Sequence, residues 1–228
     1  MTIKQILSKG MIILKGNNVD SPKLKARLLL QFILKKPREY LIIYDNKEID
    51  KKQQWEYFVN IEKLVSGVPL QHITHYQEFM KMDFYVDENV LIPRPDTEIL
   101  VEETIKIAQK MNKPKILDLC TGSGAIAISL AKNLPEAEIY GIDISQKAID
   151  IAKMNAKALK VKVKFLKSNL FDKLDDIKFD IIVSNPPYIK KGIICDLSKE
   201  VQKEPEIALN GGIDGLFLRL KLFLVLFE

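Results

Sequence analysis

Apolar residues recur at helical spacing through the first seventy or so residues of the chain. Ser21 offers a capping hydroxyl and Pro22 stands at the first helical position, which together are typical of a helix start. From Leu24 onward apolar side chains return every three to four residues, and a second periodic run ends at Gly67. The pattern therefore predicts a small α-helical domain over residues 1–75, with its many lysines on a solvated face.

The pattern changes over residues 76–95, where short and partly alternating apolar runs indicate β-strands. The polar residues 87–89 lie between two such runs and are predicted to form the turn of a β-hairpin that links the helical domain to the rest of the chain. Directly after this linker, Asp96 or Thr97 is predicted to cap a helix, because their side-chain oxygens can accept hydrogen bonds from its first backbone N–H groups.

From residue 114 onward, predicted strands alternate with predicted helices. Strands that are separated by helices favour a parallel, doubly wound sheet, and such sheets bind ligands at the carboxyl ends of their strands. We therefore predict an α/β fold with a mainly parallel, Rossmann-like sheet in a domain over residues 96–228. The predicted strands cover residues 116–119, 139–143, 161–166 and 179–184, and the helices between them cover residues 125–133 and 146–159.

Lysine and arginine outnumber aspartate and glutamate by 35 to 30, which gives the chain a modest net charge of +5. This excess permits an acidic partner without requiring one, and it lacks the clustered basic stripe typical of dedicated nucleic-acid-binding domains.

Cys120 and Cys195 stand far apart without a C-x-x-C pattern, which argues against a disulfide scaffold and favours a reducing compartment. The most apolar stretch, residues 216–227, is shorter than the about 20 residues of a membrane-spanning helix. We expect a soluble cytoplasmic protein with no membrane partner.

The sequence DLCTGSG, residues 118–124, closes a predicted strand and opens a predicted helix. Glycines at such a turn let the backbone approach a bound cofactor without an intervening side chain. Asp143 ends the next strand, where a carboxylate can accept hydrogen bonds from both ribose hydroxyls, although it could instead cap the following helix, a role for which Ser145 competes. These features alone fit either a dinucleotide or S-adenosylmethionine, but the third glycine of a dinucleotide loop is absent after Gly124, which favours S-adenosylmethionine.

The sequence Asn-Pro-Pro-Tyr, residues 185–188, comes directly after the fourth predicted strand. A nitrogen atom conjugated to a carbonyl or an aromatic ring is a poor nucleophile, so it must be held in line with the methyl donor while its developing positive charge is stabilised. The Asn185 side-chain oxygen and the Pro186 carbonyl can accept its two N–H bonds, and Tyr188 can pack against the flat group. The motif predicts methyl transfer to a planar amide or amino nitrogen, without a metal or a covalent intermediate.

Together with GIDIS at residues 141–145 and VLIPRPDTE at residues 90–98, these motifs resemble the HemK/PrmC family of peptide-chain release factor glutamine methyltransferases. The resemblance covers about residues 20–215, and motifs in two separate regions agree in order and spacing. It implies methylation of the glutamine amide in the Gly-Gly-Gln motif of class 1 release factors. It also implies S-adenosylmethionine as the methyl donor and the helical domain as the docking site for the protein substrate. We expect a monomer without a nucleic-acid partner.

The resemblance also implies roles for individual residues. It implies a cofactor site formed by Cys120, Thr121, Gly122, Ser123, Gly124, Asp143, Asn169, Leu170 and Asn185, with Leu170 on the adenine side. It implies a substrate site formed by Asn185, Pro186, Pro187 and Tyr188, of which Asn185, Pro186 and Tyr188 are the catalytic residues.

Three places in the chain depart from the pattern of the family. Cys120 stands where the loop usually has its first glycine, and we expect a free buried thiol without a redox role. Asn169 replaces the usual aspartate, which keeps a hydrogen-bond acceptor but loses its charge. The sequence QHITH, residues 71–75, replaces a segment that normally carries tyrosine and glycine. Its two histidines, His72 and His75, are three residues apart, but no further ligands lie near them in the sequence, so no metal site is expected.

The sequence after residue 216, FLRLKLFLVLFE, has neither helical nor strand periodicity. The resemblance implies about three more strands and a helix, so this ending is expected to be a C-terminal truncation or a frameshift product that leaves an apolar sheet edge uncovered. Two alternatives to the release factor enzyme remain: a nucleic-acid methyltransferase acting on an adenine amino group, and an inactive truncated remnant.

Overall fold

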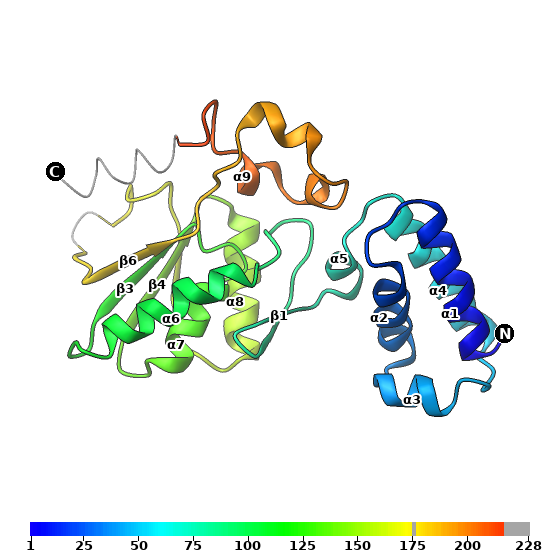
Figure 1. Ribbon diagram of the computed structural model, residues 1–228. Helices are drawn as coiled ribbons and strands as arrows, with labels where there is room; N and C mark the ends of the chain where they lie inside the picture. Colours follow the sequence, from blue (N-terminus) through cyan, green and yellow to red (C-terminus); the bar gives the residue numbers. More distant parts are fainter. Residues whose placement is uncertain (175–176, 217–228) are drawn as a thin grey trace. The chain divides into compact units, whose positions relative to one another are not determined.

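The computed structural model describes residues 1–174 and 177–216 (Figure 1). The chain forms two compact units. The first comprises Met1–Thr74 and Ser198–Lys203, and the second comprises His75–Leu197 and the chain from Glu204 onward. The apolar ending, residues 217–228, on which the predicted truncation depends, lies outside the described residues.

The first unit consists of helices around one hydrophobic core. Thr2 caps the first helix in a capping box with Gln5, in which each side chain bonds the other residue's backbone N–H. Asp50 caps the fourth helix by accepting hydrogen bonds from two backbone N–H groups of its first turn. The helices are α1 (Ile3–Gly16), α2 (Pro22–Leu34), α3 (Arg38–Ile43), α4 (Lys51–Val65) and α5 (Leu70–Thr74).

Helix α2 forms where the sequence predicts it, but its cap differs from the prediction. Ser21 has a left-handed backbone conformation (φ 49°), so its side chain does not cap the helix, and its hydroxyl donates to Asp20 instead. The row of Leu29 and Ile33 packs into the core. A second apolar row on the same helix stays 38–44% exposed and consists of Leu24, Leu28 and Phe32.

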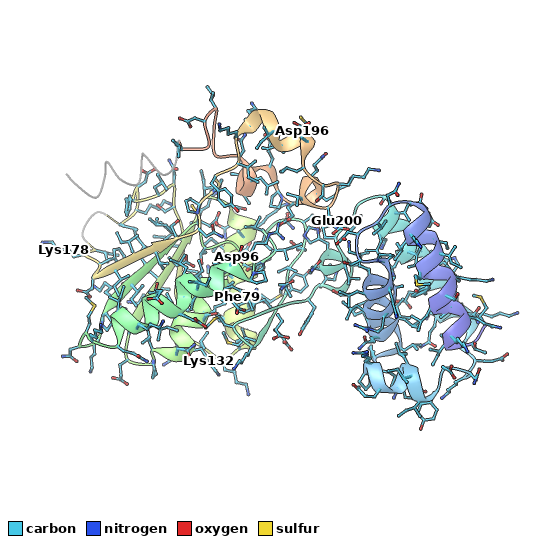
Figure 2. The ribbon with its side chains drawn as sticks, viewed as in Figure 1. Phe79, Asp96, Lys132, Lys178, Asp196 and Glu200 are labelled. Atoms are coloured by element: carbon cyan, nitrogen blue, oxygen red, sulfur yellow. The ribbon has the colours of Figure 1, made fainter. Side chains whose placement is uncertain are left out.

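The second unit begins with a short antiparallel hairpin, β1 (Gln77–Phe79) and β2 (Met82–Phe84). Met80 and Lys81 form its turn, and both have positive φ angles (51° and 59°), as in a type I′ turn. Phe79, labelled in Figure 2, is fully buried and joins the hydrophobic core that the helices and the main sheet share.

The prediction that residues 87–89 form the hairpin turn is wrong. Asp87 there accepts a hydrogen bond from the backbone of Asn89, and the residues directly after Asn89 form no strand. The apolar alternation that suggested a strand has another cause, because Val86, Val90 and Ile92 are buried in a cluster with residues of helix α8 (Gln146–Ala158).

The main sheet has four parallel strands in the order β5-β4-β3-β6, which confirms the predicted Rossmann-like α/β fold (Figure 1). Helix α7 packs against β3 and β4, and α8 packs against β4 and β5. The elements are α6 (Asp96–Ala108), β3 (Lys115–Leu119), α7 (Ala125–Asn133), β4 (Glu138–Asp143), α8 (Gln146–Ala158), β5 (Lys164–Lys167), β6 (Ile181–Ser184) and α9 (Glu206–Leu209), with 3₁₀ turns at Lys191–Asp196 and Val201–Lys203.

Helix α6 begins at Asp96, too early for either Asp96 or Thr97 to be its N-cap. Pro95 occupies the N-cap position, so both predicted capping residues lie inside the first turn and neither caps the helix. Within the part of the chain that the structure describes, no helix is long and apolar enough to cross a bilayer.

Candidate active site

Three strands of the main sheet end level with one another. Leu119 of β3 pairs with Ile142 of β4 on one side and with Ser184 of β6 on the other. Because the strands are parallel, the last residue of β4 and the residues that directly follow β3 and β6 lie together at one edge of the sheet. The structure therefore gathers Cys120, Asp143 and Asn185 at the place where the sequence predicts a ligand.

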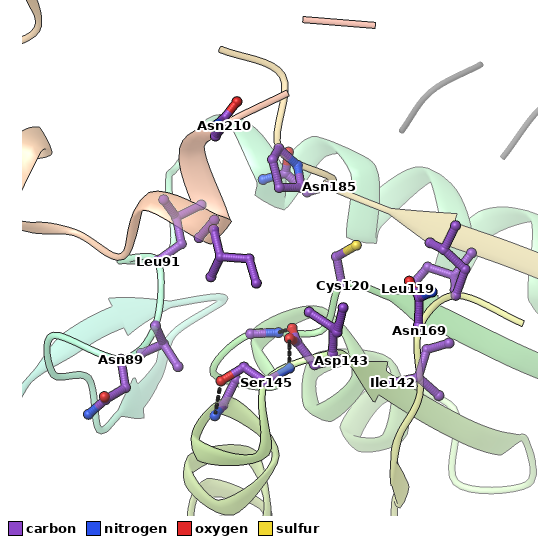
Figure 3. A pocket seen from close by; sticks show the side chains of 18 of the residues that line it. Asn89, Leu91, Leu119, Cys120, Ile142, Asp143, Ser145, Asn169, Asn185 and Asn210 are labelled. Carbon is purple, nitrogen blue, oxygen red and sulfur yellow. Dashed lines mark hydrogen bonds between the residues drawn. The ribbon is translucent and has the colours of Figure 1, made fainter. Parts of the chain in front are cut away.

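A cavity of about 650 Å³ opens at this edge, a volume typical of small-molecule sites. In the close view of Figure 3, Asn185 and Asn210 lie on the opposite side of the cavity from Asp143 and Ser145. The cavity is lined by Asn89, Val90, Leu91, Leu119, Cys120, Gly122, Ile142, Asp143, Ile144, Ser145, Ala148, Ser168, Asn169, Leu170, Asn185, Pro187, Glu206, Ile207, Ala208, Asn210 and Gly212.

The glycine loop is held against the end of β4 by backbone hydrogen bonds. Thr121 N donates to the Ile142 carbonyl over 2.9 Å, and Gly122 N donates to Oδ2 of Asp143 over 2.9 Å. Gly124 forms the N-cap of α7 with φ 82°, and a Cβ there would lie 3.0 Å from the Cβ of Ala152. Gly122 thus borders the cavity, whereas Gly124 allows α7 to approach α8 closely because it has no Cβ.

Asp143 lines the cavity and does not cap α8. Ser145 caps that helix, because its hydroxyl accepts a hydrogen bond from Ala148 N. The two oxygens of Asp143 accept hydrogen bonds from Ser145 N and Gly122 N, both at 2.9 Å. Burial raises the pKa of this carboxyl group above its usual value, and the backbone hydrogen bonds oppose that rise. These bonds fix the carboxylate of Asp143 at the cavity wall, where its oxygens can still accept further hydrogen bonds.

Asp118 lies directly beneath the loop and is fully buried. Its Oδ2 accepts hydrogen bonds from the Thr121 hydroxyl (2.6 Å) and from Ala127 N (3.1 Å), which join the loop to the first turn of α7. No group of the described chain bonds its Oδ1. Burial raises the pKa of Asp118 to about 7, so this carboxyl is a group that titrates near neutral pH.

Cys120 occupies a left-handed backbone position with φ 61°. Glycine adopts this conformation without strain, which explains why a glycine is usual there in the family that the sequence resembles. The thiol lines the cavity, and burial, followed by the charges of Asp143 and Asp118, raises its pKa to about 12. The group is therefore protonated at neutral pH, as expected of an unreactive thiol.

The Asn-Pro-Pro-Tyr segment begins at the end of β6. Asn185 donates a 3.2 Å hydrogen bond from Nδ2 to the Thr97 hydroxyl of α6. Pro187 is buried at the cavity, while Tyr188 is 51% exposed. Gly211 packs directly on this segment: a Cβ at that position would lie 2.8 Å from the Cα of Tyr188.

One wall of the cavity comes from residues 206–212, for which the sequence predicts no role in the site. Glu204, just before this wall, is 5% exposed; it accepts a hydrogen bond from Ile92 N (2.9 Å) and pairs with Arg94. The wall is thus anchored to the segment after the hairpin, which itself supplies Val90 and Leu91 to the cavity.

The structure brings together most of the predicted site residues. Seven border the cavity: Cys120, Gly122, Asp143, Asn169, Leu170, Asn185 and Pro187. Five do not border it: Thr121, Ser123, Gly124, Pro186 and Tyr188.

Thr121 and Ser123 are buried behind the loop, where Thr121 bonds Asp118 and the Ser123 carbonyl accepts a hydrogen bond from Asn155. The cavity residues that sequence reasoning missed belong mainly to residues 89–91 and 206–212. The resemblance of residues 90–98 to a family motif was a signal for the first group, and residues 206–212 lie within the stretch that the resemblance covers, although it gave them no role.

Two family models match this chain. Residues 95–209 match the family model described as methyltransferase small domain, and residues 5–74 match the PrmC N-terminal domain. The release factor glutamine methyltransferase of Clostridium acetobutylicum is 42% identical over 221 residues, which cover 95% of this chain and 78% of that protein. The chain belongs to the release factor glutamine methyltransferase family.

A second member of the family, from Koribacter versatilis, is 39% identical over 218 residues, again covering 95% of this chain and 78% of that protein. A solved structure of the Thermus thermophilus 16S rRNA N2 G1207 methyltransferase in complex with AdoMet and guanosine is also similar. It aligns with a TM-score of 0.45 and 23% identity over 56% of this chain and 36% of that one.

His72 and His75 lie at the end of helix α5 and directly after it. Among the residues that the structure describes, no group of three or more histidine, cysteine, aspartate or glutamate side chains could hold a metal ion. His75 stacks on Tyr85 with ring centroids 5.1 Å apart, and its Nδ1 lies 3.2 Å from the Val86 carbonyl. The ring of His75 therefore packs against the chain directly after the hairpin.

Proposed function

We propose that this protein transfers the methyl group of S-adenosylmethionine to the side-chain amide nitrogen of glutamine in the Gly-Gly-Gln motif of class 1 release factors. The position of Asn185 carries the proposal. Its side chain borders the cavity, and its Nδ2 is turned to Thr97, so Oδ1 is the end of the amide that can accept a hydrogen bond from a substrate N–H. The names of the two relatives support this choice of substrate.

The residues at the cavity fit S-adenosylmethionine. Gly122 has φ 55° and open space where a Cβ would stand, so a ligand can lie against its backbone. Asp143 offers a fixed carboxylate for the ribose hydroxyls, and apolar side chains such as Val90 and Leu170 offer surfaces for the adenine. When bound, S-adenosylmethionine supplies a methyl group that is electrophilic because it is attached to a positively charged sulfur.

The protein's own contribution is to orient the substrate nitrogen and to stabilise it. We assign Asn185 Oδ1 and the Pro186 carbonyl as acceptors for the two N–H bonds of the glutamine amide. These bonds hold the nitrogen in line for attack and stabilise the positive charge that grows on it until one proton leaves to water. Pro187 restricts the backbone after Asn185, and exposed Tyr188 offers its ring to the flat amide group.

We assign residues 1–75 as a docking domain for the release factor, residues 76–95 as a linker, and residues 96–228 as the methyltransferase domain. Residues 1–74 carry 13 lysines and arginines against 7 aspartates and glutamates, a net charge of +6 that suits an acidic protein surface. The exposed row on α2, which consists of Leu24, Leu28 and Phe32, supplies apolar contact area. We expect the enzyme to act as a monomer in the cytoplasm, because its two cysteines stand 75 positions apart in the sequence without a C-x-x-C pattern, as is usual in a reducing compartment.

Labelled S-adenosylmethionine tests the proposal. The full chain is incubated with a class 1 release factor, with the same factor carrying alanine in place of the glutamine of its Gly-Gly-Gln motif, and with double-stranded DNA. We expect label only in the first reaction. The variant Asn185→Ala is expected to lose about 100-fold in kcat while the protein stays folded. Label in DNA would favour the adenine-directed alternative, and absence of label everywhere would favour an inactive remnant.

A further inference from the structure

Thr97 makes a contact that its place in the sequence does not predict. It lies in the first turn of α6, where its hydroxyl was expected to cap the helix, but Pro95 holds the cap position. Instead, the Thr97 hydroxyl accepts the 3.2 Å hydrogen bond from Nδ2 of Asn185, 88 residues further along the chain. Thr97 itself does not border the cavity, and its hydrogen bond with Asn185 links it to a residue that does.

The first turn of α6 is held from two directions. Glu98 accepts a 2.7 Å hydrogen bond from Met80 N in the hairpin turn. On the other side, Glu204 bonds Ile92 N and pairs with Arg94, just before the helix. Two carboxylates therefore fix the backbone around Thr97, so its hydroxyl can hold the side chain of Asn185 in a fixed position.

The side-chain amide of asparagine can rotate by about 180° about its last torsion, because this rotation exchanges oxygen and nitrogen in nearly the same space. Only one of the two orientations suits methyl transfer. With Oδ1 toward the substrate, Asn185 accepts a hydrogen bond from the nitrogen that becomes methylated. With Nδ2 toward the substrate, two N–H groups would face each other and no hydrogen bond would form.

We propose that Thr97 is a positioning residue that holds the side-chain amide of Asn185 in place at the edge of the cavity, so that Oδ1 can meet the substrate nitrogen. This inference rests on the proposed function and adds to it a residue outside the cavity. Removal of the hydroxyl removes the bond that ties Nδ2 to α6. The amide is then free to rotate about its side-chain torsions and spends part of its time out of line with the substrate nitrogen, so turnover falls while the cavity that receives the cofactor is unchanged.

The variants Thr97→Val and Thr97→Ser test the inference, since valine has the shape of threonine without its hydroxyl and serine restores the hydroxyl. For Thr97→Val we expect kcat to fall by about 10-fold or more, with the KM for release factor within about 3-fold and the affinity for S-adenosylhomocysteine within about 2-fold of the unmodified protein. Thr97→Ser should restore kcat to within about 3-fold. A Thr97→Val protein that is folded, binds S-adenosylhomocysteine and keeps the original kcat would overturn the inference.

A double-mutant cycle separates positioning from a general structural effect. In the Asn185→Ala background, Thr97→Val should cause no further loss of kcat, because there is no amide left to orient. An equal loss in both backgrounds would contradict the inference.

A second readout does not depend on activity. The side-chain NH₂ signals of Asn185, assigned by their disappearance in Asn185→Ala, should show hydrogen exchange with water that is slow in the unmodified protein and faster in Thr97→Val. Unchanged exchange would overturn the inference even if no substrate were labelled, whereas absence of label with altered exchange would contradict only the proposed function.

Discussion

The backbone nitrogen of Ile92 donates a 2.9 Å hydrogen bond to the carboxylate of Glu204, a residue 112 positions later in the chain. The same carboxylate pairs with Arg94, and its side chain is only 2% exposed. One buried acidic group thus ties the segment before α6 to the start of the cavity wall formed by residues 206–212. This bond holds two walls of the cavity together, although neither partner borders the cavity.

The variant Glu204→Ala should lower the free energy of unfolding by about 2–3 kcal/mol, because a buried backbone N–H and a guanidinium group lose a charged partner. Urea unfolding measures this change. The control is Glu103→Ala, which removes the same side chain from an exposed pair with Lys106 and should cost at most about 1 kcal/mol. Equal costs for the two variants would show that the Glu204 contacts contribute no more than a surface pair.

Gly122 and Gly124 allow a matched comparison of two alanine substitutions. At Gly124 a Cβ would lie 2.9 Å from the Cδ1 of Ile128 and 3.0 Å from the Cβ of Ala152, at φ 82°. Gly124→Ala should therefore destabilise the fold by about 2–4 kcal/mol through overpacking and backbone strain. At Gly122 a Cβ meets no atom within 4 Å, so Gly122→Ala should cost only about 1–2 kcal/mol of stability, from its φ of 55°.

The proposed binding of S-adenosylmethionine gives a second prediction for Gly122→Ala, which concerns the affinity for a ligand. The methyl group of Gly122→Ala should weaken binding of S-adenosylhomocysteine by about 10-fold or more, since it occupies space that the ligand needs. Thermal unfolding and isothermal titration calorimetry measure the two effects. If Gly122→Ala bound S-adenosylhomocysteine as tightly as the unmodified protein, the ligand would not lie on this loop.

Asp118 should make stability depend on pH. Burial raises its pKa from the ordinary 3.8 to about 7 in the folded protein. Between these values the folded state holds a proton that the unfolded state has released, so the free energy of unfolding falls as the pH rises through this window. The slope is at most about 1.4 kcal/mol per pH unit. Burial also raises the pKa of Asp143, which contributes with the same sign.

The variant Asp118→Asn has the same shape but does not titrate. Its free energy of unfolding should therefore change less between pH 4.5 and pH 7.5 than that of the unmodified protein. Urea unfolding at a series of pH values provides the measurement. Parallel pH profiles for the two proteins would mean that the Asp118 carboxyl is ionised throughout this range.

The exposed row on α2 is expected to contact the protein substrate. Leu28→Ser combined with Phe32→Ser should raise the KM for release factor by about 10-fold or more, while the affinity for S-adenosylhomocysteine stays unchanged. Ile12→Ser serves as the control, because Ile12 is an exposed apolar residue of α1 outside this row. Steady-state kinetics give the result, and an unchanged KM in the double variant would place the docking surface elsewhere.

Much of the catalytic unit can be predicted from local sequence patterns. Helix α7 occupies the predicted residues 125–133, and β3 differs from its prediction by one residue. The level strand ends of a parallel sheet explain why Cys120, Asp143 and Asn185 could be placed together from the sequence.

The errors arise where backbone geometry or distant contacts override local preference. Ser21, Met80 and Lys81 adopt left-handed conformations that their residue types do not favour, so a cap and a hairpin turn were misplaced. The bond between Ile92 and Glu204 and that between Thr97 and Asn185 join residues about a hundred positions apart. No local period in the sequence encodes such pairs.

The cavity walls come from separate stretches of the chain, namely residues 89–91, 119–122, 142–148, 168–170, 185–187 and 206–212. A molecule bound there cross-links all of them at once. At a concentration 100 times its dissociation constant, it would add about 2.7 kcal/mol to the free energy of unfolding. A saturating concentration of such a ligand would therefore also slow the cleavage of the chain by proteases that act on its unfolded state.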